Sequence, residues 1–225
     1  MEAKVLKKWK LPSLKLNEPT KLCKLCFKEY VTKSMFHILT NYQICMNCYH
    51  EIKPVFIRFK VGKYKALAIY EYDDRIKKLL YQFKGCFDIE IFDVFLSRYA
   101  RELRLIYDGF VMVHIPSYKE DDEIREFNHV EEMFKILKLK SLNVLVKTKK
   151  VKQANLSFKE RKEIKNILDI NNGEALRNKK VLIVDDVYTT GSTMAAAISL
   201  IEQYHPKKIA ILVMSKTSFK DLKEE

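Results

Sequence analysis

The 225-residue sequence contains no run of about 18 apolar residues, the minimum for a membrane-spanning helix, so no span is predicted. Its N-terminal residues are basic but lack the apolar stretch of a secretory signal peptide. Internal repeats and low-complexity tracts are also absent from the sequence. These absences favour a globular cytoplasmic protein, and the 48% of apolar residues are enough to fill a core.

Arginine is scarce: it accounts for 8 of the 42 basic residues, and lysine for the other 34. This bias is also typical of an AT-rich genome, and scattered lysines usually only solvate a surface. The net charge of +13 is nevertheless concentrated, because residues 135–165 hold eleven Lys or Arg against two Glu. Such a patch predicts contact with a polyanion. The candidate nucleic-acid residues are Lys147, Lys149, Lys150, Lys152, Lys159 and Arg161.

Cysteine is also rare, and its odd count of five argues against a disulfide framework. Four of the five form two CxxC pairs separated by eighteen residues, the spacing of a closed, tetrahedral and structural Zn²⁺ site. Replacement of Cys48 by His50 as a ligand is the alternative. The fifth, Cys86, is expected to be a buried or half-buried thiol. The predicted metal ligands are Cys23, Cys26, Cys45 and Cys48.

Apolar periodicity predicts an α/β protein. Short apolar runs indicate strands at residues 64–72, 110–115, 143–146, 180–184 and 209–214. Helical spacing and capping signals indicate helices at residues 75–84, 89–107, 127–139, 157–168 and 192–204. This alternation predicts a parallel sheet flanked by helices. We expect a basic tail at residues 1–20, a zinc-ribbon module at 21–57 and the α/β domain at 58–225.

The segment after the strand at residues 180–184 combines two acids with a hydroxyl-rich turn at the start of a helix. Backbone amides and hydroxyls at a helix N-terminus bind anions, and Gly191 lets the backbone curl around a phosphate. Asp185 and Asp186 can accept hydrogen bonds from a vicinal diol. The segment therefore suits a sugar 5-phosphate, and the alternative is an ordinary capped strand-to-helix turn. Its candidate residues are Asp185, Asp186, Val187, Tyr188, Thr189, Thr190, Gly191, Ser192 and Thr193.

This segment resembles the signature of type I phosphoribosyltransferases, which use phosphoribosyl diphosphate (PRPP). The order of motifs is similar to that of the ComF family of competence proteins over residues 21 to about 215. It runs from the four cysteines through Phe83-Lys84-Gly85 and Ile115-Pro116 to Arg125-Glu126-Phe127-Asn128. The stretch from Gln153 to Arg161 and the PRPP loop complete it.

The resemblance implies a type I phosphoribosyltransferase fold with a flexible hood, plus a small N-terminal zinc ribbon. It implies that Asp185 and Asp186 are the catalytic pair that holds the ribose, that residues 189–193 hold the 5-phosphate, and that Mg²⁺ accompanies PRPP. Backbone amides of Ser117 and Tyr118 are candidates for the diphosphate. The chain departs from the family at Tyr188, at His129 and in the acidic run at residues 120–123, so transfer chemistry follows less directly than donor binding. His129 and His114 are interpreted as structural.

Three functions compete. The first is a competence factor acting on incoming single-stranded DNA at the inner face of the membrane, with the ComF helicase-translocase and other competence proteins. The second is a phosphoribosyltransferase of nucleotide or base salvage, and the third is a PRPP-sensing adaptor without catalysis. Diphosphate release with an acceptor distinguishes the second from the other two.

Overall fold

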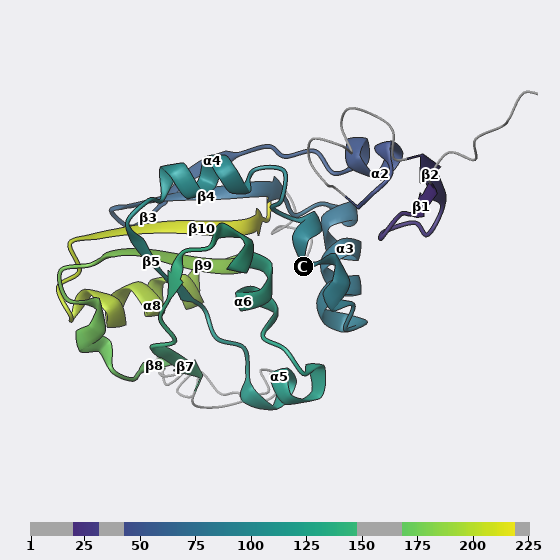
Figure 1. Ribbon diagram of the computed structural model, residues 1–225. Coiled ribbons are helices and arrows are strands. Elements are labelled where there is room, and N and C mark those ends of the chain that lie inside the picture. Colours follow the sequence, from purple (N-terminus) through teal and green to yellow (C-terminus); the bar gives the residue numbers. More distant parts are fainter. Residues whose placement is uncertain (1–19, 32–42, 148–167, 219–225) are drawn as a thin grey trace, which may run out of the picture.

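The computed structural model of the protein describes residues 20–31, 43–147 and 168–218. A six-stranded sheet lies at its centre, with the strand order β3-β4-β10-β9-β5-β6 (Figure 1). All neighbours in this sheet are parallel except β3, which forms an antiparallel hairpin with β4. Its strands are β3 (Ile57–Val61), β4 (Tyr64–Glu71), β5 (Phe110–His114), β6 (Lys140–Ser141), β9 (Lys180–Tyr188) and β10 (Lys208–Lys216).

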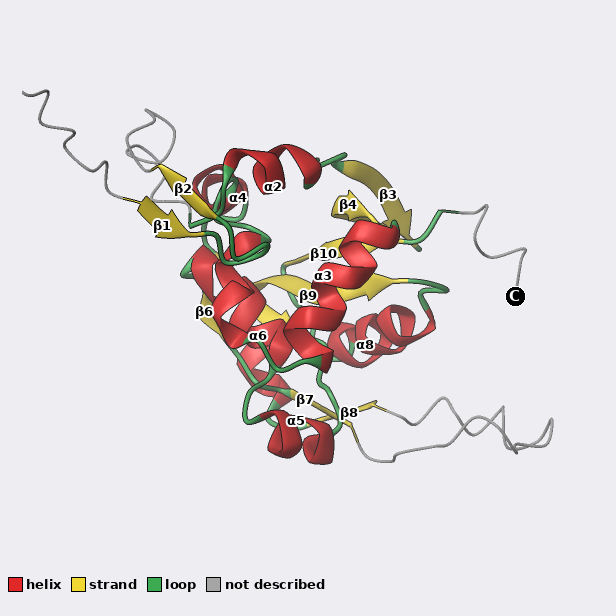
Figure 2. Ribbon diagram, turned by 90° about the vertical axis from the view of Figure 1, so that its right-hand side faces the viewer, coloured by secondary structure: helices red, strands yellow, loops and turns green. Residues whose placement is uncertain are grey.

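Helices cover both faces of the sheet (Figure 2). The α-helices are α2 (Met46–Glu51), α3 (Asp74–Gly85), α4 (Ala100–Ile106), α5 (Lys119–Arg125), α6 (His129–Phe134) and α8 (Ser192–Glu202). The 3-10 helices are η1 (Ile89–Val94), η2 (Lys135–Leu137) and η5 (Gly173–Leu176). Two small antiparallel sheets pair β1 (Thr20–Leu22) with β2 (Glu29–Val31), and β7 (Leu145–Lys147) with β8 (Leu168–Ile170).

The central strands are apolar throughout because both faces of the sheet are buried. In β9, Leu182 and Val184 belong to the core that contains α3, α4 and α6, whereas Val181 and Ile183 belong to the core under α8. Side chains alternate between the faces of a strand, so one apolar run supplies both cores. The predicted buried strands at residues 180–184 and 209–214 are thereby confirmed.

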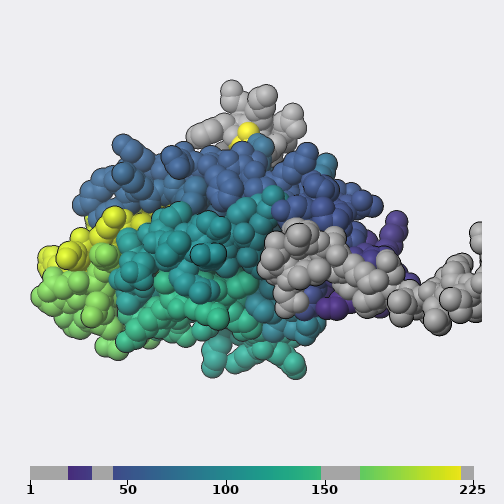
Figure 3. Space-filling view, turned by 45° about the horizontal axis from the view of Figure 1, so that its top comes forward, coloured from purple at the N-terminus to yellow at the C-terminus, as the bar shows by residue number. Residues whose placement is uncertain are grey.

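The cysteine module packs directly against the α/β core. Cys23, Ile44, Cys45 and Cys48 belong to the same hydrophobic cluster as the buried residues of α3. Polar contacts support this junction, since Arg75 Nη1 of α3 donates to the carbonyl of Glu51 at the end of α2 over 2.8 Å. On one side of the molecule the hairpin β3–β4 (blue) adjoins α4 (teal) in a continuous surface (Figure 3).

The helix predicted at residues 75–84 is confirmed. Asp73 is its N-cap, and its side chain accepts from the backbone N–H groups of Arg75 and Ile76 at 3.1 and 2.9 Å. The predicted strand at 110–115 and the helix at 192–204 are also confirmed to within two residues. Among the described residues, no helix is both long and apolar enough to cross a membrane.

The prediction of one helix over residues 89–107 is wrong. The structure has the 3-10 helix η1, a series of turns, and then α4. Within these turns the hydroxyl of Tyr70 donates to the carbonyl of Phe95 over 2.8 Å, in place of the helical partner of that carbonyl. The amide of Tyr99 instead donates to Leu96. The apolar periodicity survives because Phe95 and Leu96 are still buried.

The helix predicted at residues 127–139 is shorter than expected. It begins at His129 after the N-cap Asn128, and it tightens to a 3-10 turn at Lys135. Strand β3 and helix α5 were not predicted. The helix predicted at residues 157–168 lies outside the described residues, except that Leu168 begins β8.

Candidate functional sites

Two acids lie at the carboxyl end of β9, in the middle of the sheet. The strand continues through Asp185 and Asp186, and α8 begins at Ser192 after a short loop. Each carboxylate accepts the backbone N–H of the following residue, at 2.9 Å for Asp185 and 2.7 Å for Asp186. The carboxyl ends of parallel strands are where α/β proteins bind ligands, which makes this edge the first candidate site.

Asp186 is buried and bound by two donors. Lys84 Nζ, at the end of α3, lies 2.6 Å from its Oδ2, and His129 Nε2, at the start of α6, lies 3.2 Å from the same oxygen. Burial alone would raise the pKa of Asp186, but the hydrogen bond from His129 and the positive charge of Lys84 outweigh it and hold this pKa below its ordinary value. Asp186 is therefore ionised at neutral pH.

Asp185 differs from its neighbour. Burial and the adjacent negative charge of Asp186 raise the pKa of Asp185 well above its usual range. Within the pair, the pKa of Asp185 is therefore higher than that of Asp186. Two such groups side by side suit hydrogen bonds with the hydroxyls of a sugar diol.

A cavity of about 420 Å³ opens above the two acids. It brings together Asp185, Asp186 and Thr193 with Ser117 and Tyr118, which follow β5 more than sixty residues earlier in the chain. Besides these predicted residues, its wall includes three cationic side chains, one histidine and one more acid: Lys84, Arg125, Lys147, His129 and Asp121.

Lys147 is the one predicted nucleic-acid residue that the structure describes, and it lines this cavity. Its ammonium lies 4.6 Å from the centre of the Tyr118 ring. Burial lowers the pKa of Lys147, and the nearby Asp185 partly opposes this shift. The remaining candidates, Lys149, Lys150, Lys152, Lys159 and Arg161, lie outside the described residues.

The loop between β9 and α8 presents hydroxyl groups to solvent. Thr189, Thr190, Ser192 and Thr193 are exposed, and Thr190 Oγ1 lies 3.1 Å from Ser192 Oγ. Gly191 has a φ of 78°, in the left-handed region that favours glycine. This arrangement of backbone N–H groups and hydroxyls at the start of an eleven-residue helix can bind a phosphate.

The side chain of Tyr188 fills the space beside Gly191. A Cβ atom at Gly191 would lie 2.2 Å from the Tyr188 hydroxyl, and the Tyr188 ring is held by Phe59, with ring centres 4.7 Å apart. We expect Gly191→Ala to lower the free energy of unfolding by about 1–3 kcal/mol, from left-handed strain and this clash. Urea denaturation measures the effect.

The control for this prediction is the same substitution in a Tyr188→Leu background. The clash is then removed and only the backbone strain remains, about 1–2 kcal/mol. An equal penalty in both backgrounds would show that the Tyr188 ring is not what fills the space.

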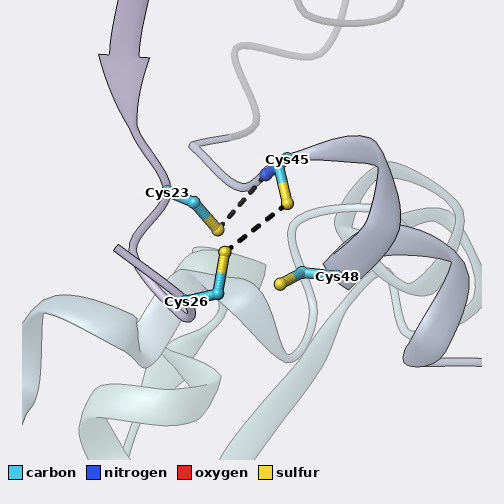
Figure 4. Close-up of side chains that lie close together, drawn as sticks. All are labelled: Cys23, Cys26, Cys45 and Cys48. Atoms are coloured by element: carbon cyan, nitrogen blue, oxygen red, sulfur yellow. Dashed lines mark hydrogen bonds between the residues drawn. The ribbon is translucent and has the colours of Figure 1, made fainter. Parts of the chain in front are cut away.

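The four predicted cysteines form a second site (Figure 4). Their sulfur atoms all lie within 4.8 Å of one another, and Cys26 Sγ and Cys45 Sγ are 3.7 Å apart. Tetrahedral zinc with Zn–S bonds of about 2.3 Å places sulfurs about 3.8 Å apart, so the four thiols fit Zn²⁺. Burial would raise the pKa of Cys23, but backbone N–H groups, including that of Cys45 at 3.3 Å, lower it to about 7.

Two expectations about neighbouring residues can now be judged. His50 is exposed and does not belong to the cysteine cluster, which the four thiols complete by themselves. The expectation of a buried or half-buried Cys86 is wrong, since this residue is exposed where α3 ends. It is the C-cap of α3.

Sequence reasoning missed the roles of Lys84, Arg125 and His129. All three belong to or adjoin the motifs that carry the family resemblance, but no charge pattern indicated that Lys84 and His129 would meet at Asp186, with Arg125 bonded to both of them. His129 was interpreted as structural, whereas the structure places it in contact with a predicted site residue.

Comparison with known proteins agrees with this geometry. The family model for the phosphoribosyl transferase domain matches residues 94–221, more than half of the chain. The chain belongs to the phosphoribosyl transferase domain family. Its fold is the type I phosphoribosyltransferase fold, with a mostly parallel sheet, and its N-terminal cysteine cluster is consistent with a zinc ribbon.

The curated relatives are named as competence proteins or as phosphoribosyltransferases. Competence protein ComFC of Bacillus subtilis is 31% identical over 71% of this chain and 67% of its own length. Competence protein ComFC of Streptococcus pneumoniae is 28% identical over 63% of this chain and 64% of its own length. The chain therefore spans about two thirds of these relatives. Hypoxanthine-guanine phosphoribosyltransferase of Mus musculus is 49% identical, but only over 45 residues, 19% of this chain and 21% of its own length.

Proposed function

We propose that this protein is a competence factor that binds PRPP and acts on incoming single-stranded DNA in the cytoplasm. The observation that carries the PRPP proposal is the cavity at the end of β9, where two acids, Thr193 of the hydroxyl-rich loop and three cations converge. The competence proposal rests on the two ComFC relatives. The partners proposed with it are a ComF helicase-translocase and other competence proteins at the inner face of the membrane.

PRPP would bind in three parts, with its 5-phosphate in the smaller hollow that the loop of residues 189–193 forms next to the cavity. The ribose hydroxyls would bind Asp185 and Asp186, and the 5-phosphate would bind the loop of residues 189–193. The diphosphate would bind the amides of Ser117 and Tyr118, where the positive charges of Lys84, Arg125 and Lys147 offset its negative charge.

Mg²⁺ is proposed to arrive with PRPP. Apart from the four cysteines, residues 20–31, 43–147 and 168–218 contain no group of three or more His, Cys, Asp or Glu side chains that could hold a metal ion. Mg²⁺ typically uses one or two carboxylates and the phosphates of its substrate, which fits the acid pair of β9. When bound, it would neutralise charge on the diphosphate. Zn²⁺ would be structural, because four cysteines leave no open ligand position.

The DNA-binding part of the proposal rests on charge. The basic residues 135–165 and the tail at residues 1–20 would contact the phosphates of DNA. Lys147 is the exception, since it lines the PRPP cavity. The proposed domains that follow the tail are a zinc-ribbon module at residues 21–57 and the transferase-like domain at residues 58–225.

PRPP titration with and without Mg²⁺ and single-stranded DNA tests both parts together. We expect the wild-type protein to bind PRPP in Mg²⁺, and the Asp185→Ala/Asp186→Ala variant to lose PRPP binding but keep DNA binding. DNA affinity should fall about tenfold or more between 50 and 200 mM salt, for roughly three phosphate contacts on a single strand. If DNA shifts PRPP affinity, PRPP must shift DNA affinity by the same factor.

Each alternative has its own outcome in this experiment. Release of diphosphate with a base acceptor would identify a salvage transferase. A protein that binds PRPP but shows neither turnover nor DNA binding would be a PRPP-sensing adaptor. The proposal would be contradicted if the wild type did not bind PRPP, or if its DNA affinity were the same at low and high salt.

A further inference from the structure

His129 touches three different parts of the candidate PRPP site. Its Nε2 lies 3.2 Å from Asp186 Oδ2 of β9. Its Nδ1 lies 2.9 Å from Arg125 Nη1, at the end of α5, and 3.2 Å from Ser117 Oγ, in the loop proposed to bind the diphosphate. The imidazole is buried, with 8% of the residue exposed. It therefore connects the acid proposed to hold the ribose with the part of the site proposed to hold the diphosphate.

The contact with Arg125 fixes the tautomer of this histidine. A guanidinium group can only donate hydrogen bonds, so His129 Nδ1 must be the acceptor. The ring proton is then on Nε2, which donates to the carboxylate of Asp186.

Arg125 and Lys84 complete a closed ring of hydrogen bonds. Arg125 Nε donates to the backbone carbonyl of Lys84 over 3.1 Å, and Lys84 Nζ donates to Asp186 Oδ2 over 2.6 Å. Asp186 Oδ2 thus accepts from Lys84 and His129 at once, while its Oδ1 accepts the amide of Val187. A ribose hydroxyl that binds Oδ2 has to compete with one of these donors.

Lys84 is the donor that can leave. Its side chain is 36% exposed, against 11% for His129, and it lines the cavity beside Arg125. A bound diphosphate would attract its ammonium group away from Asp186 and open Oδ2 to the ribose. A buried carboxylate that loses a donor is costly unless another remains, and His129 is the donor that remains.

We propose that His129 is a positioning residue that makes the diphosphate and ribose halves of PRPP bind cooperatively. The inference rests on the proposed PRPP site. His129 keeps Asp186 oriented and hydrogen-bonded while Lys84 moves to the diphosphate, so that filling one half of the site favours filling the other.

The test measures the affinity for ribose 5-phosphate with and without saturating diphosphate, by calorimetry at fixed Mg²⁺. In the wild type we expect diphosphate to tighten ribose 5-phosphate binding at least about fivefold, the lower end of usual coupling between sites. In His129→Leu we expect a factor below about two. In His129→Gln, whose amide can both accept and donate, we expect most of the wild-type factor to return. His50→Leu, an exposed histidine outside the cavity, is the matched control.

The outcomes separate this inference from the function on which it rests. If PRPP binds but His129→Leu keeps the wild-type factor, the positioning role is wrong and the PRPP site stands. If the wild type binds neither PRPP nor its two halves, both are wrong. If His129 had a merely structural role, its substitution would weaken the binding of both ligands. The factor by which diphosphate tightens ribose 5-phosphate binding would stay the same. Long-range ¹H–¹⁵N spectra of the wild type provide a test that needs no variant, and protonation of His129 at Nδ1 would overturn the proposal.

Discussion

The Asp186→Asn variant is expected to bind PRPP at least about 100-fold more weakly than the wild type. Hydrogen bonds to a charged partner contribute about 1.5–3 kcal/mol each, and two of them at the ribose account for a loss of this size. The amide would also point a donor toward Lys84 and His129, which both donate to Asp186 in the wild type. Isothermal titration calorimetry with PRPP and Mg²⁺ measures the change.

Asp108→Asn is the matched control for this variant. It removes the same charge from an exposed position between α4 and β5, outside the cavity. We expect its PRPP affinity to equal that of the wild type. Circular dichroism confirms that both variants are folded. A loss of less than about threefold in Asp186→Asn, well under 1 kcal/mol, would mean that Asp186 does not bind the ribose.

Removal of zinc is expected to lower the melting temperature of the whole protein by about 10–20 °C. A structural zinc site contributes on the order of 10 kcal/mol to the folding of a small module, and part of this is lost as other contacts relax. If the free energy of unfolding of the full chain falls by about 5 kcal/mol, the melting temperature falls by about 10–20 °C, because a protein of this size loses about 2–4 °C per kcal/mol. The effect reaches the α/β core because Cys23, Cys45 and Cys48 share a cluster with α3.

Three samples measure this effect by calorimetric scanning: the wild type, the wild type with a strong chelator, and Cys48→Ser. The chelator and the Cys48→Ser substitution should lower the melting temperature by similar amounts. Elemental analysis should find one zinc per chain in the untreated wild type. Cys86→Ser is the control, because that thiol is exposed and lies outside the cluster. An unchanged melting temperature after complete removal of zinc would contradict a structural role.

Local sequence signals predicted the acid pair and the turn at the carboxyl end of β9. An apolar run, two acids and a glycine-containing turn are contiguous in β9 and the start of α8, so their arrangement depends little on distant residues. The two CxxC pairs also carry their geometry in their spacing, and the structure brings all four thiols together.

Local sequence signals could not predict contacts between residues that are far apart in the chain. His129 and Lys84 meet Asp186 across 57 and 102 positions of the chain, and nothing in their local sequence indicates it. Lys147 was interpreted from the charge around it, whereas folding places its ammonium over Tyr118 inside the cavity. The hydroxyl of Tyr70, which bonds the carbonyl of Phe95 within the expected helix, comes from a residue 25 positions earlier in the chain.

Helix α3 gives the molecule a mechanical connection. Arg75, near its start, is bonded to the end of α2 in the cysteine module, and Lys84, near its other end, is bonded to Asp186. A helix of twelve residues is about 18 Å long and stiff on that scale. A displacement of the cysteine module would therefore be transmitted along α3 to Lys84, whose ammonium group is bonded to Asp186. A movement at the Arg75 end of α3 would therefore change how often Lys84 is bonded to Asp186 at the other end.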